Sequence, residues 1–357
     1  MPFSNRSPTH STRTSFKHSD LPSLSAVFRA ESKGLGTGES GFLRLYTDRF
    51  GPIPVPYPPL DEQRLIVRFL DWHGSRTGKL IRAKKKLVAL LNEQKQAITK
   101  RAVTRGLNDS AELKPSGVPW IGDVPRHWEL KKLKHMTRFN NGLAFKPSDW
   151  SSVGVPIIRI QNLNGSEAFN YTTRIGLPDN LLIRKGDLMF SWSGNPGTSF
   201  GSFMWDRDFE GYLNQHIFKL TAYTVDRLYF YYLLRAVTKH VEDETHGIIG
   251  LVHITKPELG SVVVPVAPRD EQITIARRIE EQAASVTAII ERTRRELALL
   301  QEFRTCLIAD VVTGKLDVRA LAATLPETVD LEPVEEPADD DDLDETVDDA
   351  ENEEIAA

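Results

Sequence analysis

The sequence is poor in the features that several common protein classes require. Its 357 residues include one cysteine, Cys306, which excludes a disulfide framework and a metal site built from several cysteines. No apolar run approaches the roughly 18 residues that a transmembrane helix needs. A chain with so little cysteine is suited to a reducing compartment, and we predict a cytoplasmic location.

Motifs that carry catalysis are also missing. The segment GSRTGKL at Gly74 resembles a phosphate-binding loop, but three residues separate its glycines where four are needed, and Leu80 replaces Ser or Thr. The nine histidines never show the His-Glu-x-x-His spacing of a zinc site. Neither the Asn/Asp-Pro-Pro-aromatic tetrapeptide of amino-methyltransferases nor a nuclease-like carboxylate pair followed by lysine is found. The sequence therefore favours a reader or a scaffold over an enzyme.

Charge is divided unevenly along the chain. Residues 327–357 hold 16 acidic residues and no Lys or Arg, so the rest of the chain has 45 basic and 33 acidic residues, a net charge near +12. A basic body predicts a polyanion as partner. We expect residues 317–357 to form a disordered acidic tail, with competition for the basic surface as the weaker reading. Residues 1–30, rich in Ser and Thr, are expected to be disordered too, rather than a transit peptide.

An internal repeat is the clearest feature of the sequence. A shift of 209 positions aligns residues 55–107 with residues 264–316 without a gap, and 16 of the 53 pairs are identical. Composition alone would give roughly 3. Both copies open on a proline-rich entry followed by Asp-Glu-Gln, and the globular stretch before the second copy has no full counterpart before the first. We expect a two-unit protein in which residues 31–60 are the end of a first domain.

Each proline-rich entry leads into a long helical pattern, over residues 61–107 and 270–316. Asp61 and Asp270 are expected N-caps, while Gly106 and Gly314 stand where the helices should end. Apolar residues step by four and three, so we predict two helices of roughly 65 Å that pair as an antiparallel coiled coil. The expected interface residues are Leu70, Ile81, Val88, Leu91, Ile279, Val286, Ile290, Leu297 and Leu300. The lysines at 84–86 are read as a solvated face rather than as phosphate contacts.

Residues 116–265 form a globular segment of mixed α and β structure. The stretches at 155–163, 187–194 and 211–223 are expected strands, and residues 226–243 are an expected amphipathic helix. The fold class is therefore α+β, with one mixed domain and two long helices.

Polar and aromatic residues in the loops of this segment are candidates for DNA contact. Asn and Gln can bond both N6 and N7 of adenine, and lysines can hold phosphates. A glycine-rich hairpin turn at residues 191–201, and exposed polar strand ends elsewhere, are equally open explanations. His253 and Lys256 are weaker candidates near the end of the segment. The DNA-binding candidates are Lys131, Lys132, Lys134, Lys146, Arg159, Gln161, Asn162, Trp192, Ser193, Asn195, Asn214, Gln215, His216 and His246.

Residues 38–316 resemble the specificity subunit of type I restriction-modification enzymes. The likeness depends on PPLDEQR and APRDEQI opening the two helices, on the repeat, on SGVPWIGDVPRHWELKKLKHM from Ser116, and on GVPIIRIQNLNG from Gly154. In that family, two target-recognition domains read the halves of a split DNA site, and the helices act as a ruler that docks methyltransferase subunits.

The resemblance implies a non-catalytic chain whose partners are double-stranded DNA, methyltransferase subunits, restriction and motor subunits, and a second specificity chain. S-adenosylmethionine, ATP and magnesium would belong to those partners, and this chain would carry no cofactor. Most of the first recognition domain is expected to be missing, so one chain would read one half-site. A coiled-coil scaffold that reads no DNA and an inactive truncated subunit are the alternatives.

Overall fold

A computed structural model describes residues 57–244 and 251–327 of the chain. These residues divide into two compact units. Unit 1 contains residues 57–89 and 290–327, and unit 2 contains residues 90–244 and 251–289. The expected disordered segment 1–30, most of the expected domain remnant 31–60, most of the acidic tail and His246 lie outside the described residues. Within the described part, no helix has both the length and the apolar character to cross a membrane.

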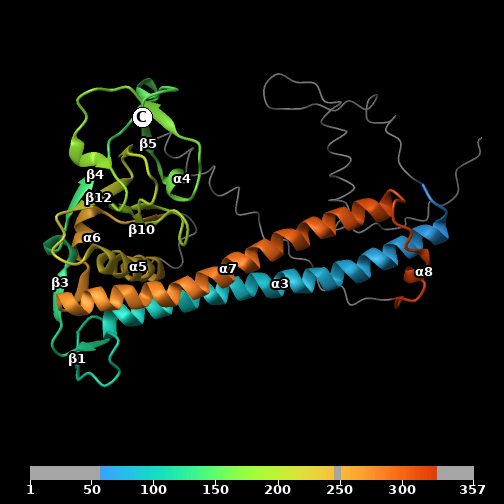
Figure 1. Ribbon diagram of the computed structural model, residues 1–357, viewed down its shortest axis with the longest axis horizontal. Coiled ribbons are helices and arrows are strands. Elements are labelled where there is room, and N and C mark those ends of the chain that lie inside the picture. Colours follow the sequence, from blue (N-terminus) through green and yellow to red (C-terminus); the bar gives the residue numbers. More distant parts are fainter. Residues whose placement is uncertain (1–56, 245–250, 328–357) are drawn as a thin grey trace, which may run out of the picture. The chain divides into compact units, whose positions relative to one another are not determined.

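Two long helices contribute to both units, α3 (Leu60–Arg105) and α7 (Arg269–Val312), drawn in blue to cyan and in orange in Figure 1. The repeated Asp-Glu-Gln triplet shows why each begins where it does. The Gln63 side chain donates to the Pro58 carbonyl at 2.8 Å, and the equivalent Gln272 donates to the Ala267 carbonyl at 2.7 Å. Each glutamine therefore ties the first helical turn back to the entry that precedes it.

The helix ends differ slightly from the prediction. Asp61 and Asp270 lie inside the first turns and are not N-caps, although a carboxylate there still interacts favourably with the helix dipole. Gly106 and Gly314 both have a φ of +75°, a left-handed conformation that glycine adopts at little cost. The helices end just before these glycines, earlier than the expected residues 107 and 316.

In unit 1 the two helices lie side by side and run in opposite directions. Lys84 Nζ lies 2.5 Å from Glu296 Oε2, and Phe69 is buried in one cluster with Val311 and with Ala322 of the short helix α8 (Arg319–Ala322). The predicted interface residues of this unit are at least half buried: Leu70, Ile81, Val88, Ile290, Leu297 and Leu300. Lys84 belongs to this contact, whereas Lys85 and Lys86 are exposed.

In unit 2 the same two helices also contact each other. Lys95 Nζ donates to Thr287 Oγ1 at 3.0 Å, and Ile279 and Val286 are buried. Leu91 is half buried. The far end of α3 and the start of α7 enter the main core of the globular segment through residues such as Val103 and Ile275.

Two four-stranded sheets form the centre of the globular segment. The first is antiparallel, in the order β10-β8-β12-β4, and the second is mixed, in the order β6-β5-β11-β7, with β11 parallel to β5. Two-stranded ladders join β1 to β2, β13 to β9 and β14 to β3. The strands are β1 (Leu113–Pro115), β2 (Asp123–Pro125), β3 (Glu129–Lys132), β4 (Arg138–Asn141), β5 (Val155–Ile158), β6 (Asn170–Thr172), β7 (Leu182–Ile183), β8 (Leu188–Ser191), β9 (Ser193–Gly194), β10 (Gly201–Met204), β11 (Gly211–Leu213), β12 (Ile217–Thr221), β13 (Val252–His253) and β14 (Val263–Val266).

Two apolar cores cover the two faces of the antiparallel sheet. Because successive side chains of a strand point to opposite faces, Leu188 and Phe190 of β8 enter the main core while Met189 enters the second core. The main core also includes helices α5 (Arg227–Glu244) and α6 (Lys256–Ser261). The helix predicted at residues 226–243 and the mixed α and β composition of the segment are confirmed.

The predicted strand at residues 155–163 is only half correct. Strand β5 ends at Ile158, and residues Ile160–Leu163 form the short helix α4. The Asn162 side chain accepts from the Arg159 N–H at 2.9 Å and donates to the Ala168 carbonyl at 2.9 Å, which fixes the turn. An asparagine that bonds nearby backbone groups competes with a strand, and this local bonding outweighs the apolar pattern.

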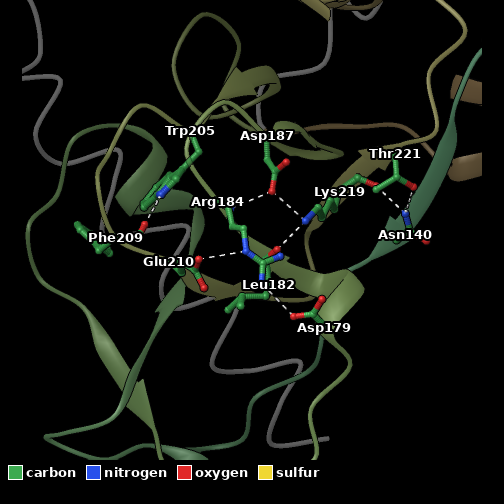
Figure 2. Close-up of polar contacts among 10 residues, drawn as sticks. All are labelled: Asn140, Asp179, Leu182, Arg184, Asp187, Trp205, Phe209, Glu210, Lys219 and Thr221. Carbon is green, nitrogen blue, oxygen red and sulfur yellow. Dashed lines mark hydrogen bonds and ion pairs between the residues drawn. The ribbon is translucent and has the colours of Figure 1, made fainter.

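Lys219 connects the two sheets from inside the fold. Its side chain is only 8% exposed, and its Nζ donates to the Leu182 carbonyl of β7 at 2.5 Å and lies 2.8 Å from Asp187 Oδ2 (Figure 2). Asp187 also accepts from the Arg184 N–H at 2.8 Å. The buried lysine therefore fixes β12 of the first sheet to β7 of the second.

Candidate nucleic-acid interface

Trp192 lies where several candidate residues meet. Its N–H donates to the His216 carbonyl at 3.1 Å, and its indole Nε1 donates to the Gln215 carbonyl at 3.1 Å. The turn between β11 and β12 is thus attached to the residue that follows β8. The indole ring lies 4.9 Å from the His216 ring and 5.0 Å from the His253 ring, measured between centroids.

The ladder between β9 and β13 completes this group. It places His253 directly opposite Ser193, and the Ile254 N–H donates to the Trp192 carbonyl at 2.9 Å. We name Trp192, Ser193, Gln215, His216 and His253 the Trp192 cluster. His253 is exposed, and Trp192, Ser193 and Gln215 are half buried, so the cluster offers an indole edge, an imidazole, a hydroxyl and an amide to a partner.

His216 and Asn214 are the buried part of this region. His216 is 7% exposed, and its Nε2 lies 3.0 Å from the Gln215 Nε2. Asn214 is 3% exposed, and its N–H donates to the Ile158 carbonyl at 3.0 Å. A Cβ on Gly142 would lie 1.9 Å from the Asn214 carbonyl oxygen, so only glycine fits there. Asn214 therefore supports the turn between β11 and β12 from inside the fold, and its side-chain amide is not presented to solvent.

Arg159 and Asn162 are also buried, contrary to the surface role expected for them. Arg159 is 5% exposed, and its guanidinium lies over the Trp150 ring, 5.5 Å from the centroid. Asn162 is 2% exposed and holds the α4 turn. Gln161, between them in the sequence, is half buried. Of the three neighbouring polar residues, Arg159 and Asn162 therefore support the fold, and only Gln161 has an amide that reaches solvent.

The glycine-rich loop at residues 191–201 is a tight turn in which several N–H groups already have acceptors. The Asn195 N–H donates to Ser199 Oγ at 2.6 Å, and the N–H groups of Ser199 and Phe200 both return to the Asn195 carbonyl. The Gly197 N–H donates to the buried Glu242 carboxylate of α5 at 2.7 Å. Because a carboxylate occupies that N–H, the turn interpretation accounts for the glycines better than a phosphate cradle.

All four candidate lysines are exposed. Lys131 and Lys132 lie on β3, Lys134 follows in a 3-10 turn at 133–135, and Lys146 precedes a second turn at 147–149. Lys131 Nζ lies 2.8 Å from Glu129, and this pairing lowers the pKa of the Glu129 carboxyl. Lys132, Lys134 and Lys146 have no such carboxylate partner among the described residues.

His253 was the residue that sequence reasoning placed least well. It was expected only as a weaker candidate near the end of the globular segment, yet it lies in the Trp192 cluster because β13 pairs with β9, a strand 59 residues earlier in the sequence. No local pattern signals a pairing between two such short strands. Among the described residues, no group of three or more His, Cys, Asp or Glu side chains is placed to hold a metal ion.

A family model and several curated proteins are similar to this chain. Residues 125–299 match the model of the type I restriction modification DNA specificity domain. The MjaVIII specificity subunit of Methanocaldococcus jannaschii is 26% identical over 287 residues, which cover 76% of this chain and 64% of the relative. The EcoBI specificity subunit of Escherichia coli is 25% identical over 212 residues, covering 58% of this chain and 43% of the relative. The chain thus spans less than two thirds of the length of these two relatives.

One solved structure shares the fold. It comes from a study of complex assembly and conformational transition of the type I R-M system, and it aligns with a TM-score of 0.55 at 17% sequence identity. The alignment covers 83% of this chain and 68% of the other.

Proposed function

Because this chain belongs to the family of type I restriction-modification specificity subunits, we propose that its globular segment reads the bases of one half of a split DNA site. The observation that carries the proposal is the convergence of the Trp192 cluster. Three separate segments bring polar and aromatic groups to one exposed place, inside the residues that match the DNA specificity domain.

We assign the base contacts to the members of the cluster that are not fully buried. The Gln215 amide has the donor and acceptor that a bidentate contact with adenine requires, and His253 and Ser193 supply further donors and acceptors. Trp192 holds these groups in place and offers its ring edge to a thymine methyl or a sugar. His216, Asn214, Arg159 and Asn162 are support for this surface and not readers, because they are buried.

The exposed lysines are assigned to the phosphates. Lys132, Lys134 and Lys146 are positive, exposed and located on the same globular segment as the cluster. Contacts of this kind position a protein on DNA and carry no sequence information.

We further propose that α3 and α7 pair as an antiparallel coiled coil that docks methyltransferase subunits. The helix contacts at Lys84–Glu296 and Lys95–Thr287 support the pairing. The chain would be non-catalytic and cytoplasmic. Methylation and cleavage would be performed by modification and restriction subunits, with S-adenosylmethionine, ATP and magnesium bound by those partners.

The test is to map methylated adenines genome-wide in cells that hold the cognate methyltransferase, with and without this gene. A gene-dependent split motif is expected. The Gln215→Ala and His253→Ala variants should each relax the motif at one position, because a lost base contact costs roughly 1–3 kcal/mol of discrimination. Gln301→Ala, an exposed glutamine of α7, is the matched control and should leave the motif unchanged.

Two results would contradict this assignment. If Gln215→Ala and His253→Ala lower methylation equally at every site, the cluster does not read bases. If the assembled complex shows the same methylation with and without this gene, the chain is a scaffold or is inactive.

A further inference from the structure

One side of helix α3 in unit 1 carries a line of cations. Residues 72–92 of this helix contain six Lys or Arg residues and no acidic residue. Positions 64, 68, 79, 82 and 86 fall within about 60° of one another around a helix with 3.6 residues per turn, so they share one side of it. We name the residues at these positions the basic stripe: Arg64, Arg68, Lys79, Arg82 and Lys86.

The basic stripe lies on the side of α3 that is turned away from α7. Lys84, on the opposite side, is the residue that reaches Glu296 of α7, whereas Lys79, Arg82 and Lys86 are exposed. Neighbouring members of the stripe are three or four residues apart, and like charges at that spacing destabilise a helix. An anionic segment laid along the stripe would relieve this repulsion.

The stripe already contacts the residue with which the acidic part of the chain begins. Arg68 Nη2 donates to Glu327 Oε1 at 3.3 Å. Glu327 is the first of the 16 acidic residues in residues 327–357, which contain no Lys or Arg. Helix α8, just before it, is fixed to α3 because Ala322 is buried in one cluster with Phe69. The acidic segment therefore leaves the described part of unit 1 beside the stripe.

The acidic segment is long enough to follow the stripe over its whole length. Arg68 and Lys86 are 18 positions apart on α3, which corresponds to about 27 Å at 1.5 Å per residue. Twelve residues separate Glu327 from the start of the four consecutive aspartates Asp339–Asp342. Twelve residues of extended chain span about 40 Å. The four aspartates can therefore reach any position on the stripe.

We propose that residues 328–357 bind along the basic stripe of their own chain, with Asp339–Asp342 beside Lys79 and Lys86. A single exposed ion pair contributes little, but a tethered segment with many charges has an effective concentration in the millimolar range. The bound segment keeps the stripe from other polyanions, so that contacts with nucleic acid are left to the globular segment. This contact does not require that the chain read bases.

The first experiment treats the full chain with a carbodiimide, which joins a carboxylate directly to an amine that it touches. Mass spectrometry of the monomer fraction then identifies the lysines joined to residues 328–357. We expect Lys79 and Lys86, and a strong decrease of both products in about 1 M salt, where the screening length is about 3 Å. The exposed lysines of unit 2, such as Lys132 and Lys146, are the internal controls and should not be joined to the segment.

Three results of this experiment would overturn the proposal. Products at Lys132 or Lys146 in place of Lys79 and Lys86 would mean that the acidic segment covers the globular segment instead. Products found only between two chains would mean that the stripe binds the segment of a second copy. No product at any lysine would mean that the segment binds none of these surfaces.

The second experiment tests whether the bound segment shields the stripe. Replacing Asp339–Asp342 by Asn should raise the affinity for duplex DNA of random sequence by at least about fivefold and steepen the salt dependence by about 2, because Lys79 and Lys86 become available. In a chain that also carries Lys79→Gln and Lys86→Gln, the same replacement should change neither quantity. Lys100→Gln, at an exposed lysine of α3 outside the stripe, is the matched control and should leave the gain intact.

A gain of the same size with and without the two stripe lysines would contradict the proposal, since the segment would then act by general repulsion of DNA. So would the absence of any gain in the chain with an intact stripe. Circular dichroism checks that each variant is folded. The cross-linking experiment contains no DNA, so its failure would leave the proposed base reading unaffected.

Discussion

Lys219 shows how much one residue can contribute to this domain. From the sequence alone, a lysine at this position of strand β12 would be predicted to be exposed, because charged side chains are seldom buried. Here it lies on the face of β12 that enters the second core, and its charge is compensated by Asp187 and by the Leu182 carbonyl. The two sheets depend on this contact because it is made across them, inside the fold.

Replacing Lys219 by Met should therefore destabilise the domain by about 2–3 kcal/mol, because the change leaves the Asp187 carboxylate without its cation and the Leu182 carbonyl without its donor. Lys185→Met is the matched control, since Lys185 also pairs with an aspartate, Asp208, but on the exposed surface. Urea denaturation followed by circular dichroism measures both. Equal effects of the two substitutions would contradict a special role of Lys219.

His240 gives a prediction of pH dependence. Its ring stacks on Trp120 at 4.8 Å with 13° between the planes, and burial lowers its pKa below the usual 6.5. Glu244 and Asp243 act to raise this pKa and Lys100 acts to lower it further, so burial and Lys100 together outweigh the two carboxylates.

Because the folded form disfavours the protonated ring, the stabilisation is complete above about pH 6.5 and is lost as the pH falls through the folded pKa. His240→Phe keeps the stacking and removes the titration. Between pH 7 and pH 5, the unmodified chain should lose more unfolding free energy than the variant, measured by urea titrations at each pH. Parallel pH curves would show that His240 does not contribute.

At the scale of elements, the long helices and α5 could be predicted and the short elements could not. Repeated apolar spacing over some 45 residues is a strong signal, whereas strands such as β9 and β13 have two residues each. The start of α4 was missed because the decisive contact, from Asn162 to the Arg159 N–H, is a side-chain bond and not a pattern. The same bond engages the Asn162 side chain inside the fold and removes this residue from the predicted surface.

The end of α3 gives a prediction at this scale. Gly106→Ala should cost about 1–2 kcal/mol for the left-handed backbone and about 1 kcal/mol more for the close contact with Trp128. Gly117→Ala is the control in the same unit, because Gly117 has a similar φ of +73° and open space around the added Cβ. The difference between the two denaturation free energies measures the Trp128 contact. No difference would mean that the Trp128 ring moves aside freely.

For the molecule as a whole, the basic surface predicts how binding responds to salt. Lys132→Ala should weaken binding to matched and unmatched DNA by the same factor and reduce the slope of log affinity against log salt by about 1. Lys79→Ala, an exposed lysine of α3, is the control. Titrations of labelled DNA at several salt concentrations measure the slope. A change in sequence preference would show that Lys132 reads bases.

The class of the whole molecule could be inferred from the sequence, since the repeat and its proline-rich entries are visible without a structure. The surface proposed to read DNA could be inferred only in part. Trp192, Ser193 and Gln215 were identified as loop residues, but their neighbour His253 joins them through long-range pairing of β9 with β13. Some of the other candidate residues are buried and others are exposed. The sequence could not separate the two groups, because burial depends on contacts between segments far apart in the sequence.

The ladder that joins β9 to β13 has a consequence for how such a domain evolves. Backbone groups make this pairing, so it is indifferent to which side chains stand at positions 193 and 253. Mutations at these positions can therefore exchange one chemical group for another while the geometry of presentation persists. The binding preference of such a domain can therefore change through single surface substitutions, while the backbone that presents these side chains stays the same.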